Sequence, residues 1–267
     1  MIIVQISDMH VTLPGRPLYG KIDTHAAMQA AVAHIVAMET PPDVVIATGD
    51  LVHEATVEGY AELLALLKPI PAPVYVIPGN HDDRAAMREA LAGHDYLAGD
   101  GFVLYAIDDH PVRIVGLDTI IPGKVAGALC RGRLEWLESR LAEAPDTPTL
   151  VLMHHPPFET GVGYMDRMGC LEGAEELGAI IQRNPQVERV LCGHDHRPVQ
   201  TRWHGTIGQI CPSTAHQMYL TFDGEQDGRW LREPAGCLVH RWAEGAGITT
   251  HLSYIGDYGP AQEFGKD

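Results

Sequence analysis

Near its start the chain reads Ile2-Ile3-Val4-Gln5-Ile6-Ser7-Asp8-Met9-His10, and this stretch decides the fold. An apolar run typical of a β-strand ends here in an aspartate and a histidine. The same arrangement recurs at Val44–Ala47 before Gly49-Asp50, Val74–Ile77 before Gly79-Asn80-His81-Asp82, Leu150–Met153 before His154-His155-Pro156-Pro157, and Val187–Leu191 before Gly193-His194-Asp195-His196. Strands that alternate with helices in a parallel sheet end on one edge, so these side chains are expected to converge there.

The residue types at the strand ends predict a dinuclear metal centre. Imidazole nitrogens together with carboxylate and amide oxygens suit Zn, Mn, Fe or Co, and no thiolate ligand is present to favour an Fe–S or structural zinc site. The candidate ligands are too many for one tetrahedral ion and suit two ions that share a carboxylate. Two ions about 3.5–4 Å apart can hold the attacking and leaving oxygens of a displacement at phosphorus, and they lower the pKa of bound water to about 7.

Taken in order, the five motifs resemble the calcineurin-like metallophosphoesterase superfamily. Further segments are similar to its bacterial glycerophosphodiesterase and class III cyclic-nucleotide phosphodiesterase branch: Leu18-Tyr19-Gly20, Ile77–Asp83, Met153–Pro157 and Cys192-Gly193-His194. The resemblance implies an α/β fold, a four-layer αββα sandwich of two mixed sheets with a small C-terminal cap or oligomerisation segment. Residues 1–198 would form the catalytic domain, and residues 199–267 would complete the second sheet and supply the cap and oligomer contact.

The resemblance also implies a role for each site residue. The first metal would be held by Asp8, His10 and His196, the second by Asn80, His154 and His194, and Asp50 would bridge them. The catalytic residues would be His81 and Asp50, and substrate would contact His81, His216, Asn80 and Tyr19. One position departs from the pattern, because His53 stands where many members of the superfamily carry a carboxylate or an amide.

The function implied is a dinuclear metal-dependent phosphodiesterase. It would hydrolyse small phosphodiesters, either glycerophosphodiesters or 3′,5′-cyclic nucleotides, by attack of a metal-bound hydroxide. Two alternatives stay open: a phosphomonoesterase of the same superfamily and a non-catalytic metal-binding scaffold. The complete set of ligand positions and the presence of His81 favour the enzyme. No arginine adjoins the first four motifs as in the protein phosphatases of the superfamily.

Composition limits the partners. With a formal net charge of −16, the chain would repel a nucleic acid polymer, whereas a small phosphodiester can still reach two cations. No apolar run of about 18 residues predicts a membrane span, and no signal peptide is visible. The 5 cysteines form no C-x-x-C pair and are expected as free thiols. We therefore expect a cytoplasmic protein, and the resemblance implies a homo-oligomer, dimer or higher, through the C-terminal segment.

The remaining pattern predicts the elements between the motifs. Helical spacing of apolar residues predicts helices over Thr24–Glu39, Val57–Lys68, Arg133–Glu143 and Gly173–Arg183. Two short runs, Phe102–Ile107 and Val112–Asp118, predict an antiparallel hairpin that starts a second sheet. After residue 198 the strands expected are Thr206–Ile210, Gly236–Arg241 and Ile248–Tyr254.

Overall fold

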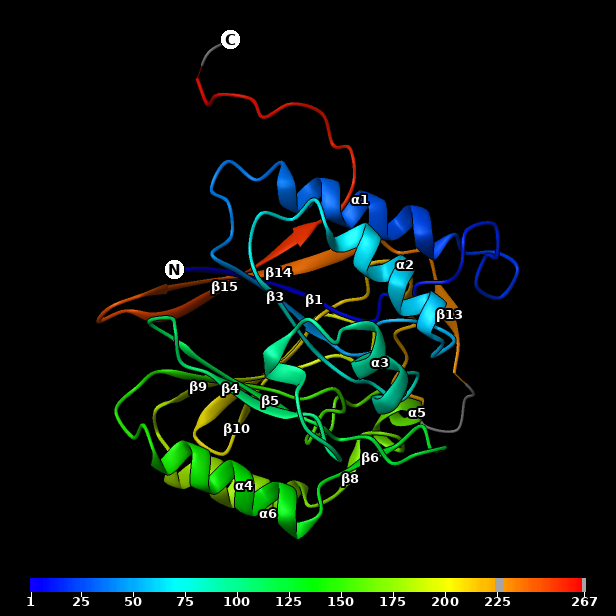
Figure 1. Ribbon diagram of the computed structural model, residues 1–267. Coiled ribbons are helices and arrows are strands. Elements are labelled where there is room, and N and C mark those ends of the chain that lie inside the picture. Colours follow the sequence, from blue (N-terminus) through cyan, green and yellow to red (C-terminus); the bar gives the residue numbers. More distant parts are fainter. Residues whose placement is uncertain (224–227, 266–267) are drawn as a thin grey trace.

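Two β-sheets face each other, and helices cover the outer face of each one, so the chain forms four layers (Figure 1). The computed structural model describes residues 1–223 and 228–265. The covering helices are α1 (Thr24–Val36) and α2 (Val57–Leu67) on the first sheet, and α4 (Arg131–Ala142) and α6 (Ala174–Arg183) on the second. This arrangement confirms the sandwich of two mixed sheets that the sequence predicted.

The first sheet has the strand order β15-β14-β1-β2-β3. Its members are β1 (Ile2–Ile6), β2 (Val44–Thr48), β3 (Val74–Ile77), β14 (Gly236–Ala243) and β15 (Gly247–Tyr254). Strands β1, β2 and β3 run parallel because a helix connects each to the next, whereas β14 and β15 form a hairpin antiparallel to β1. The three parallel strands therefore end at the same edge.

The second sheet has the strand order β10-β11-β9-β7-β5-β4. Its members are β4 (Leu104–Ile107), β5 (Arg113–Leu117), β7 (Thr149–Leu152), β9 (Val187–Cys192), β10 (Val199–Trp203) and β11 (Thr206–Ile210). Its four inner strands are parallel, and the edge strands β4 and β10 are antiparallel to their neighbours. The hairpin expected between residues 102 and 118 is β4–β5.

Strand β7 shows how the core divides into two clusters. Leu150 and Leu152 point toward the first sheet and join its apolar cluster, whereas Val151 and Met153 join the cluster beneath α4 and α6. Side chains alternate across a strand, so one apolar run fills both sides of a sheet that is covered on both faces. The central strands are consequently apolar at nearly every position, as the sequence pattern required.

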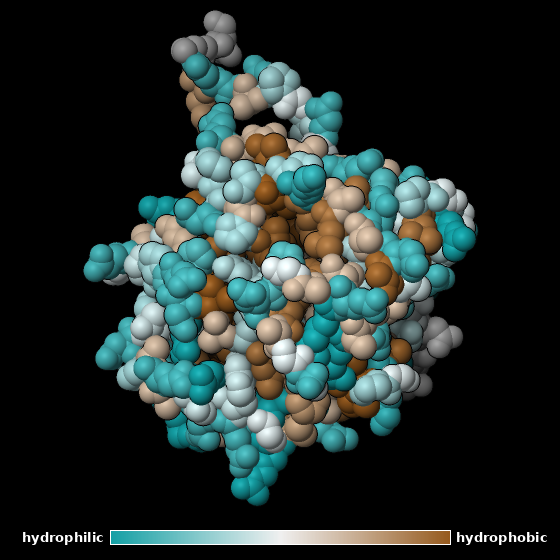
Figure 2. Space-filling model, in the orientation of Figure 1, coloured by the Kyte–Doolittle hydropathy of each residue, from teal (hydrophilic) through white to brown (hydrophobic). Residues whose placement is uncertain are grey.

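Smaller elements lie in the connections between the strands and helices of the two sheets. They are α3 (Arg84–Ala90), the 3₁₀ turn η1 (Asp95–Leu97), β6 (Gly127–Ala128), α5 (Gly163–Asp166), β8 (Cys170–Glu172), β12 (Gln217–Met218) and β13 (Trp230–Leu231). Hydrophilic side chains cover much of the face drawn in Figure 2, with apolar patches among them. Among the described residues, no helix is both long and apolar enough to span a membrane.

The structure corrects several predictions. Strands β14 and β15 were expected in the second sheet, but they extend the first sheet beside β1. Without β14, the buried strand β1 would lie at the edge of its sheet with unpaired backbone groups. Only β10, which the sequence did not predict, and β11 extend the second sheet. Helix α1 ends at Val36 rather than Glu39, and Ala37 caps it with its N–H bonded to the Ala33 oxygen. The division at residue 198 stays a prediction.

A buried polar network ties the two sheets together near the motif edge. The Gln5 Nε2 donates to Thr48 Oγ1 at 3.0 Å and to the backbone oxygen of Cys192 at 3.0 Å, and therefore crosses from one sheet to the other. Its Oε1 accepts from Nε2 of His240 at 3.2 Å, and Nδ1 of His240 in turn accepts from Thr250 Oγ1 at 2.9 Å. A neutral imidazole with its proton on Nε2 satisfies both partners, and burial favours this uncharged form.

Replacing His240 with glutamine is expected to make stability less sensitive to acid. Burial and then the charge of Arg189 lower the pKa of His240 to about 3 from 6.5, so only the unfolded chain binds this proton as the pH falls below 6.5. The wild-type free energy of unfolding should therefore lose about 1.4 kcal/mol more than that of the variant between about pH 7.5 and about pH 5.5. Urea denaturation at both pH values measures the difference, with the exposed His251→Gln as control; equal losses in wild type and His240→Gln would contradict it.

Candidate metal centre

The seven predicted ligands come together at the edge where parallel strands of both sheets end. Asp8 and His10 follow β1, Asp50 follows β2 and Asn80 follows β3; His154 follows β7, and His194 and His196 follow β9. The two sheets meet closely there, since His154 Nδ1 of the second sheet lies 2.7 Å from the backbone oxygen of Thr48 in the first. The site is therefore assembled between the sheets, with ligands from each.

The first group contains Asp8, His10, Asp50 and His196, whose donor atoms all lie within 4.8 Å of one another. The Nε2 atoms of His10 and His196 are 3.1 Å apart, and the Nε2 of His10 is 3.4 Å from Asp50 Oδ2. The Nε2 of His196 is 3.5 Å from Asp8 Oδ1. Ligands that bind one ion at about 2.1 Å are separated by about 3.0–3.4 Å, so these four side chains fit one ion.

The second group contains Asn80, His154 and His194. The Oδ1 of Asn80 lies 3.2 Å from His154 Nε2 and 3.0 Å from His194 Nδ1. The Nδ1 of His154 donates to the backbone oxygen of Thr48, so Nε2 is the nitrogen that would face a metal ion. These separations again match those of ligands around one ion.

Asp50 belongs to both groups. Its Oδ2 faces His10, whereas its Oδ1 lies 3.4 Å from His154 Nε2 and accepts a hydrogen bond from the backbone N–H of His81 at 2.9 Å. Each oxygen is thus directed to a different set of imidazoles. A carboxylate in this position can bridge two ions.

Electrostatics keep Asp50, His10 and His194 in forms that bind metal, whereas burial raises the pKa of Asp8. Burial raises the pKa of Asp50, but the imidazoles of His154 and His10 outweigh it and hold that pKa well below its usual range. Burial lowers the pKa of His10 and of His194 well below the usual value, so both are neutral. Burial also acts on His154, but the Asp50 charge raises its pKa to about 9. A metal ion would displace that proton.

Backbone strain is concentrated at the same residues. Among the described residues, 7 other than glycine have positive φ, and 5 of them are predicted ligands with φ between 43° and 75°: Asp8, His10, Asp50, His194 and His196. Left-handed backbone at such residues is unfavourable and persists where the surrounding structure holds it. The strain turns successive side chains toward the same space.

Two glycines allow the loops to approach so closely. A Cβ at Gly193 would collide with Ser7 Oγ and Asp8 Oδ2, and a Cβ at Gly79 would collide with the backbone nitrogen of Asp50. Each glycine brings one motif directly against another. The Gly-His and Gly-Asn pairs of the sequence are explained by this packing.

Asp82 holds two of the motif loops together, a role that the sequence analysis missed although it quoted the residue. Its Oδ2 accepts from the backbone N–H groups of Leu51 at 3.1 Å and Gly79 at 2.8 Å, and its Oδ1 accepts from Tyr60 at 2.9 Å. Burial raises its pKa to about 6. The carboxyl therefore fixes the Asp50 loop relative to the Asn80 loop.

The predicted substrate residues border the two groups. The His81 ring lies 4.7 Å from that of His10, and the His216 ring lies 4.5 Å from that of His196. Tyr19 is 55% exposed, with its ring 6.1 Å from His216. All three line a cavity of about 260 Å³ together with His10, Asp50, Asn80, His194 and His196.

The outer wall of this cavity is aromatic and apolar, which the sequence did not predict. Trp230 stacks on Tyr19 with ring centroids 5.9 Å apart, and the same wall contains Tyr164, three methionines (Met165, Met168 and Met218) and Arg229. Trp230 and Met218 belong to β13 and β12, beyond the last metal motif. No periodic pattern marks a two-residue strand, so only the structure could place them.

His155 has both ring nitrogens engaged outside the two groups. Its Nε2 lies 2.8 Å from the backbone oxygen of Val125, and its Nδ1 lies 2.7 Å from Thr119 Oγ1. The carbonyl can only accept, so Nε2 donates and Nδ1 accepts. Although the ring lies near His154 and His194, it therefore acts as a support for the loop rather than as a free donor for metal.

The chain is similar to known proteins along most of its length. A family model described as calcineurin-like phosphoesterase matches residues 1–198. A probable glycerophosphodiester phosphodiesterase GpdQ of Arcobacter nitrofigilis is 37% identical over 258 residues, which cover 97% of this chain and 94% of that protein. The 3′,5′-cyclic adenosine monophosphate phosphodiesterase CpdA of Escherichia coli is 32% identical over 215 residues, which cover 80% of this chain and 76% of that protein.

Solved structures show the same fold. A dimetal phosphatase from Danio rerio matches with a TM-score of 0.65 and 14% sequence identity, over 96% of this chain and 99% of that one. At this level of identity the similarity concerns the arrangement of helices and strands alone.

Asp50→Ala is expected to lower the metal content of the chain, because no other described side chain belongs to both ligand groups. Metal analysis after equilibration with Zn²⁺ and removal of free ions should give fewer ions per chain than for the wild type. The exposed Asp146→Ala serves as the matched control and should retain the wild-type content. Retention of two ions by Asp50→Ala would show that the carboxylate is not a bridge.

Proposed function

Because the chain belongs to the calcineurin-like phosphoesterase family, we propose that it is a metal-dependent phosphodiesterase that hydrolyses small phosphodiesters. The observation that carries this proposal is the position of Asp50, with one oxygen toward each group of ligands. Two metal ions held in this way supply an activated water and positive charge for the attacking and leaving oxygens.

In this proposal Asp8, His10 and His196 hold the first ion and Asn80, His154 and His194 hold the second, with Asp50 shared between them. The donor set of nitrogen and oxygen atoms accepts Fe, Mn, Zn or Co, and these are the ions proposed. The second position contains a neutral amide in place of a carboxylate. It is therefore the weaker of the two sites.

His81 is proposed as the residue that stabilises the phosphoryl group and protonates the leaving oxygen. Its Nδ1 lies 3.2 Å from the backbone oxygen of His53, which can only accept, so Nδ1 carries a proton. The other nitrogen, Nε2, then faces the cavity that His81 lines, and in the imidazolium form it carries the proton that would pass to the leaving oxygen. The carbonyl thus fixes the orientation that proton donation requires.

His216, Tyr19 and Asn80 are proposed to position the substrate. Burial and then the neighbouring His196 lower the pKa of His216 to about 3, so this imidazole is neutral near pH 7. It would therefore contact substrate through shape and hydrogen bonding rather than through charge. Tyr19 adds an exposed aromatic face beside it.

The proposed substrates are glycerophosphodiesters and 3′,5′-cyclic nucleotides, the two classes in the names of the similar proteins. A cavity of about 260 Å³ admits a small diester. The formal net charge of −16 opposes a nucleic acid polymer. We further propose a cytoplasmic location, supported by the 5 free cysteines, and a homo-oligomer through the C-terminal segment.

The proposed function predicts hydrolysis of at least one of glycerophosphocholine, glycerophosphoethanolamine and 3′,5′-cyclic AMP after metal loading. The protein is stripped with a chelator and assayed with added Mn²⁺, Co²⁺ or Zn²⁺, and release of the alcohol or of AMP is measured. Activity should require added metal. Metal-dependent hydrolysis of phosphomonoesters with no turnover of any diester would instead favour the monoesterase alternative.

His81→Ala is expected to slow hydrolysis of alkyl diesters more than that of nitrophenyl diesters, since a nitrophenolate leaves without protonation. Loss of a general acid reduces the rate by about 10²–10⁴-fold for poor leaving groups. Steady-state kcat on both substrate classes measures the difference, and metal content should stay unchanged. His216→Ala is the comparison variant and should mainly raise KM. Equal losses on both classes in His81→Ala would exclude proton donation.

A further inference from the structure

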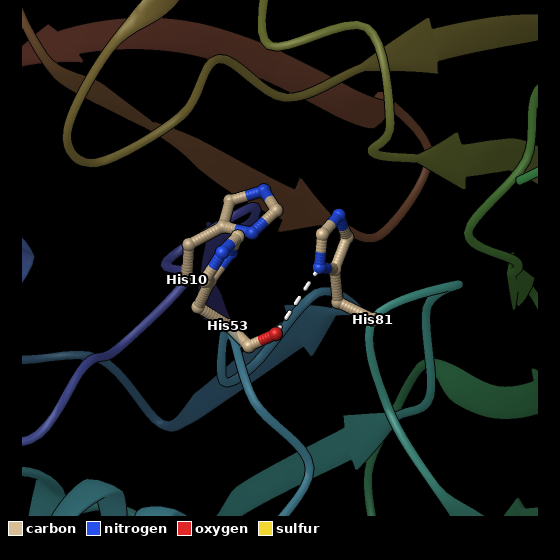
Figure 3. A group of neighbouring side chains, drawn as sticks. All are labelled: His10, His53 and His81. Atoms are coloured by element: carbon tan, nitrogen blue, oxygen red, sulfur yellow. Dashed lines mark hydrogen bonds between the residues drawn. The ribbon is translucent and has the colours of Figure 1, made fainter. Parts of the chain in front are cut away.

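A third group of imidazoles lies next to the two proposed metal positions. One ring nitrogen of each of His10, His53 and His81 lies within 4.8 Å of the other two. The rings of His53 and His81 are stacked with centroids 5.0 Å apart, and the His10 ring lies 5.9 Å from that of His53 (Figure 3). None of the roles assigned above uses the His53 side chain.

The His53 side chain lacks a hydrogen-bond partner among the described residues. Its Nδ1 is buried without a partner, as are His10 Nδ1, His194 Nε2 and His216 Nδ1, whereas both ring nitrogens of His155 and of His240 are bonded. A buried polar atom without a partner is unfavourable unless water or an ion satisfies it. The His53 ring, which carries this free nitrogen, lies beside the ring of His81, the residue proposed to protonate the leaving oxygen.

Two carboxylates lie in the chain segment around His53, although Arg16 lines the cavity that it borders. Glu54 follows directly, and Asp50 lies in the same loop, in a chain whose formal net charge is −16. His53 borders a second cavity, of about 220 Å³, which lies beside the Tyr19 ring and next to the active site. A small hydrated ion could reach the imidazole through that cavity without passing the two proposed metal positions.

We propose that His53 and His81 form a third, weaker site for a divalent transition-metal ion, which fills when the ion is in excess and inhibits the enzyme. This inference rests on the proposed function, because it assumes two tightly held ions and a role for His81. His10 is left to the first ion, since an imidazole that bound two ions would have to lose both protons. Two imidazoles and water would complete the third site.

Inhibition would follow from the atom of His81 to which the ion binds. The Nδ1 proton of His81 is directed at the backbone oxygen of His53, so the ion would bind at Nε2. That is the atom proposed to donate a proton to the leaving oxygen. The site is weaker than the other two because it offers no carboxylate and lies close to two cations.

The test uses chelated protein reloaded with two equivalents of Zn²⁺, into which further Zn²⁺ is titrated by calorimetry while hydrolysis is assayed in parallel. Wild type is expected to bind a third equivalent and to lose activity over the same concentration range. His53→Asn keeps the backbone oxygen that orients His81, and its inhibition is measured relative to its own activity at two equivalents. The half-inhibiting Zn²⁺ concentration should rise by about 10–100-fold, the loss typical of removing a contact at a metal site.

The exposed His251→Asn is the matched control and should behave as wild type does in both measurements. The absence of a third equivalent in wild type, or its persistence with unchanged inhibition in His53→Asn, would overturn the proposal. Failure of the proposed function would look different: wild type would hydrolyse no ester at two equivalents, while calorimetry would still report whether the third ion binds.

Discussion

The site depends on one buried carboxylate that is shared between two groups of imidazoles. Asp50 remains ionised at 2% exposure because His154 and His10 lie against its two oxygens and the backbone N–H of His81 donates to one of them. A buried charge without such partners would be strongly unfavourable. The same requirement fixes the fold around it, because His10 comes from the first sheet and His154 from the second. The two sheets must therefore face each other with their parallel strands ending at the same level.

The neighbouring interactions all serve this alignment. Gln5 joins the two sheets from a position in β1, before the ligand Asp8. Asp82 joins the loop that carries Asp50 to the loop that carries Asn80. Close approach of the loops requires Gly79 and Gly193, and left-handed backbone turns the ligands inward. The strain of the left-handed ligand residues is a cost that metal ions would offset on binding.

Much of the fold and the centre of the site could be predicted from sequence, because both depend on local pattern. Apolar runs located β1 and β3 at their observed bounds, and the residues after each strand gave the two ligand groups. Three features could not be predicted. The pairing of β14 with β1 depends on a contact across most of the chain, Trp230 lies on a strand too short for any periodicity, and the environment of His53 depends on how three loops pack.

The acidic charge of the chain and its proposed anionic substrate are compatible because they act at different distances. Two divalent ions would contribute four positive charges against two negative charges from Asp8 and Asp50, so the centre itself would be positive. At physiological salt, charges farther away than about 8 Å are largely screened, so a small diester would respond mainly to the ions. A long polyanion would also lie against the acidic surface and be repelled there. The charge distribution thus selects substrate size as well as substrate charge.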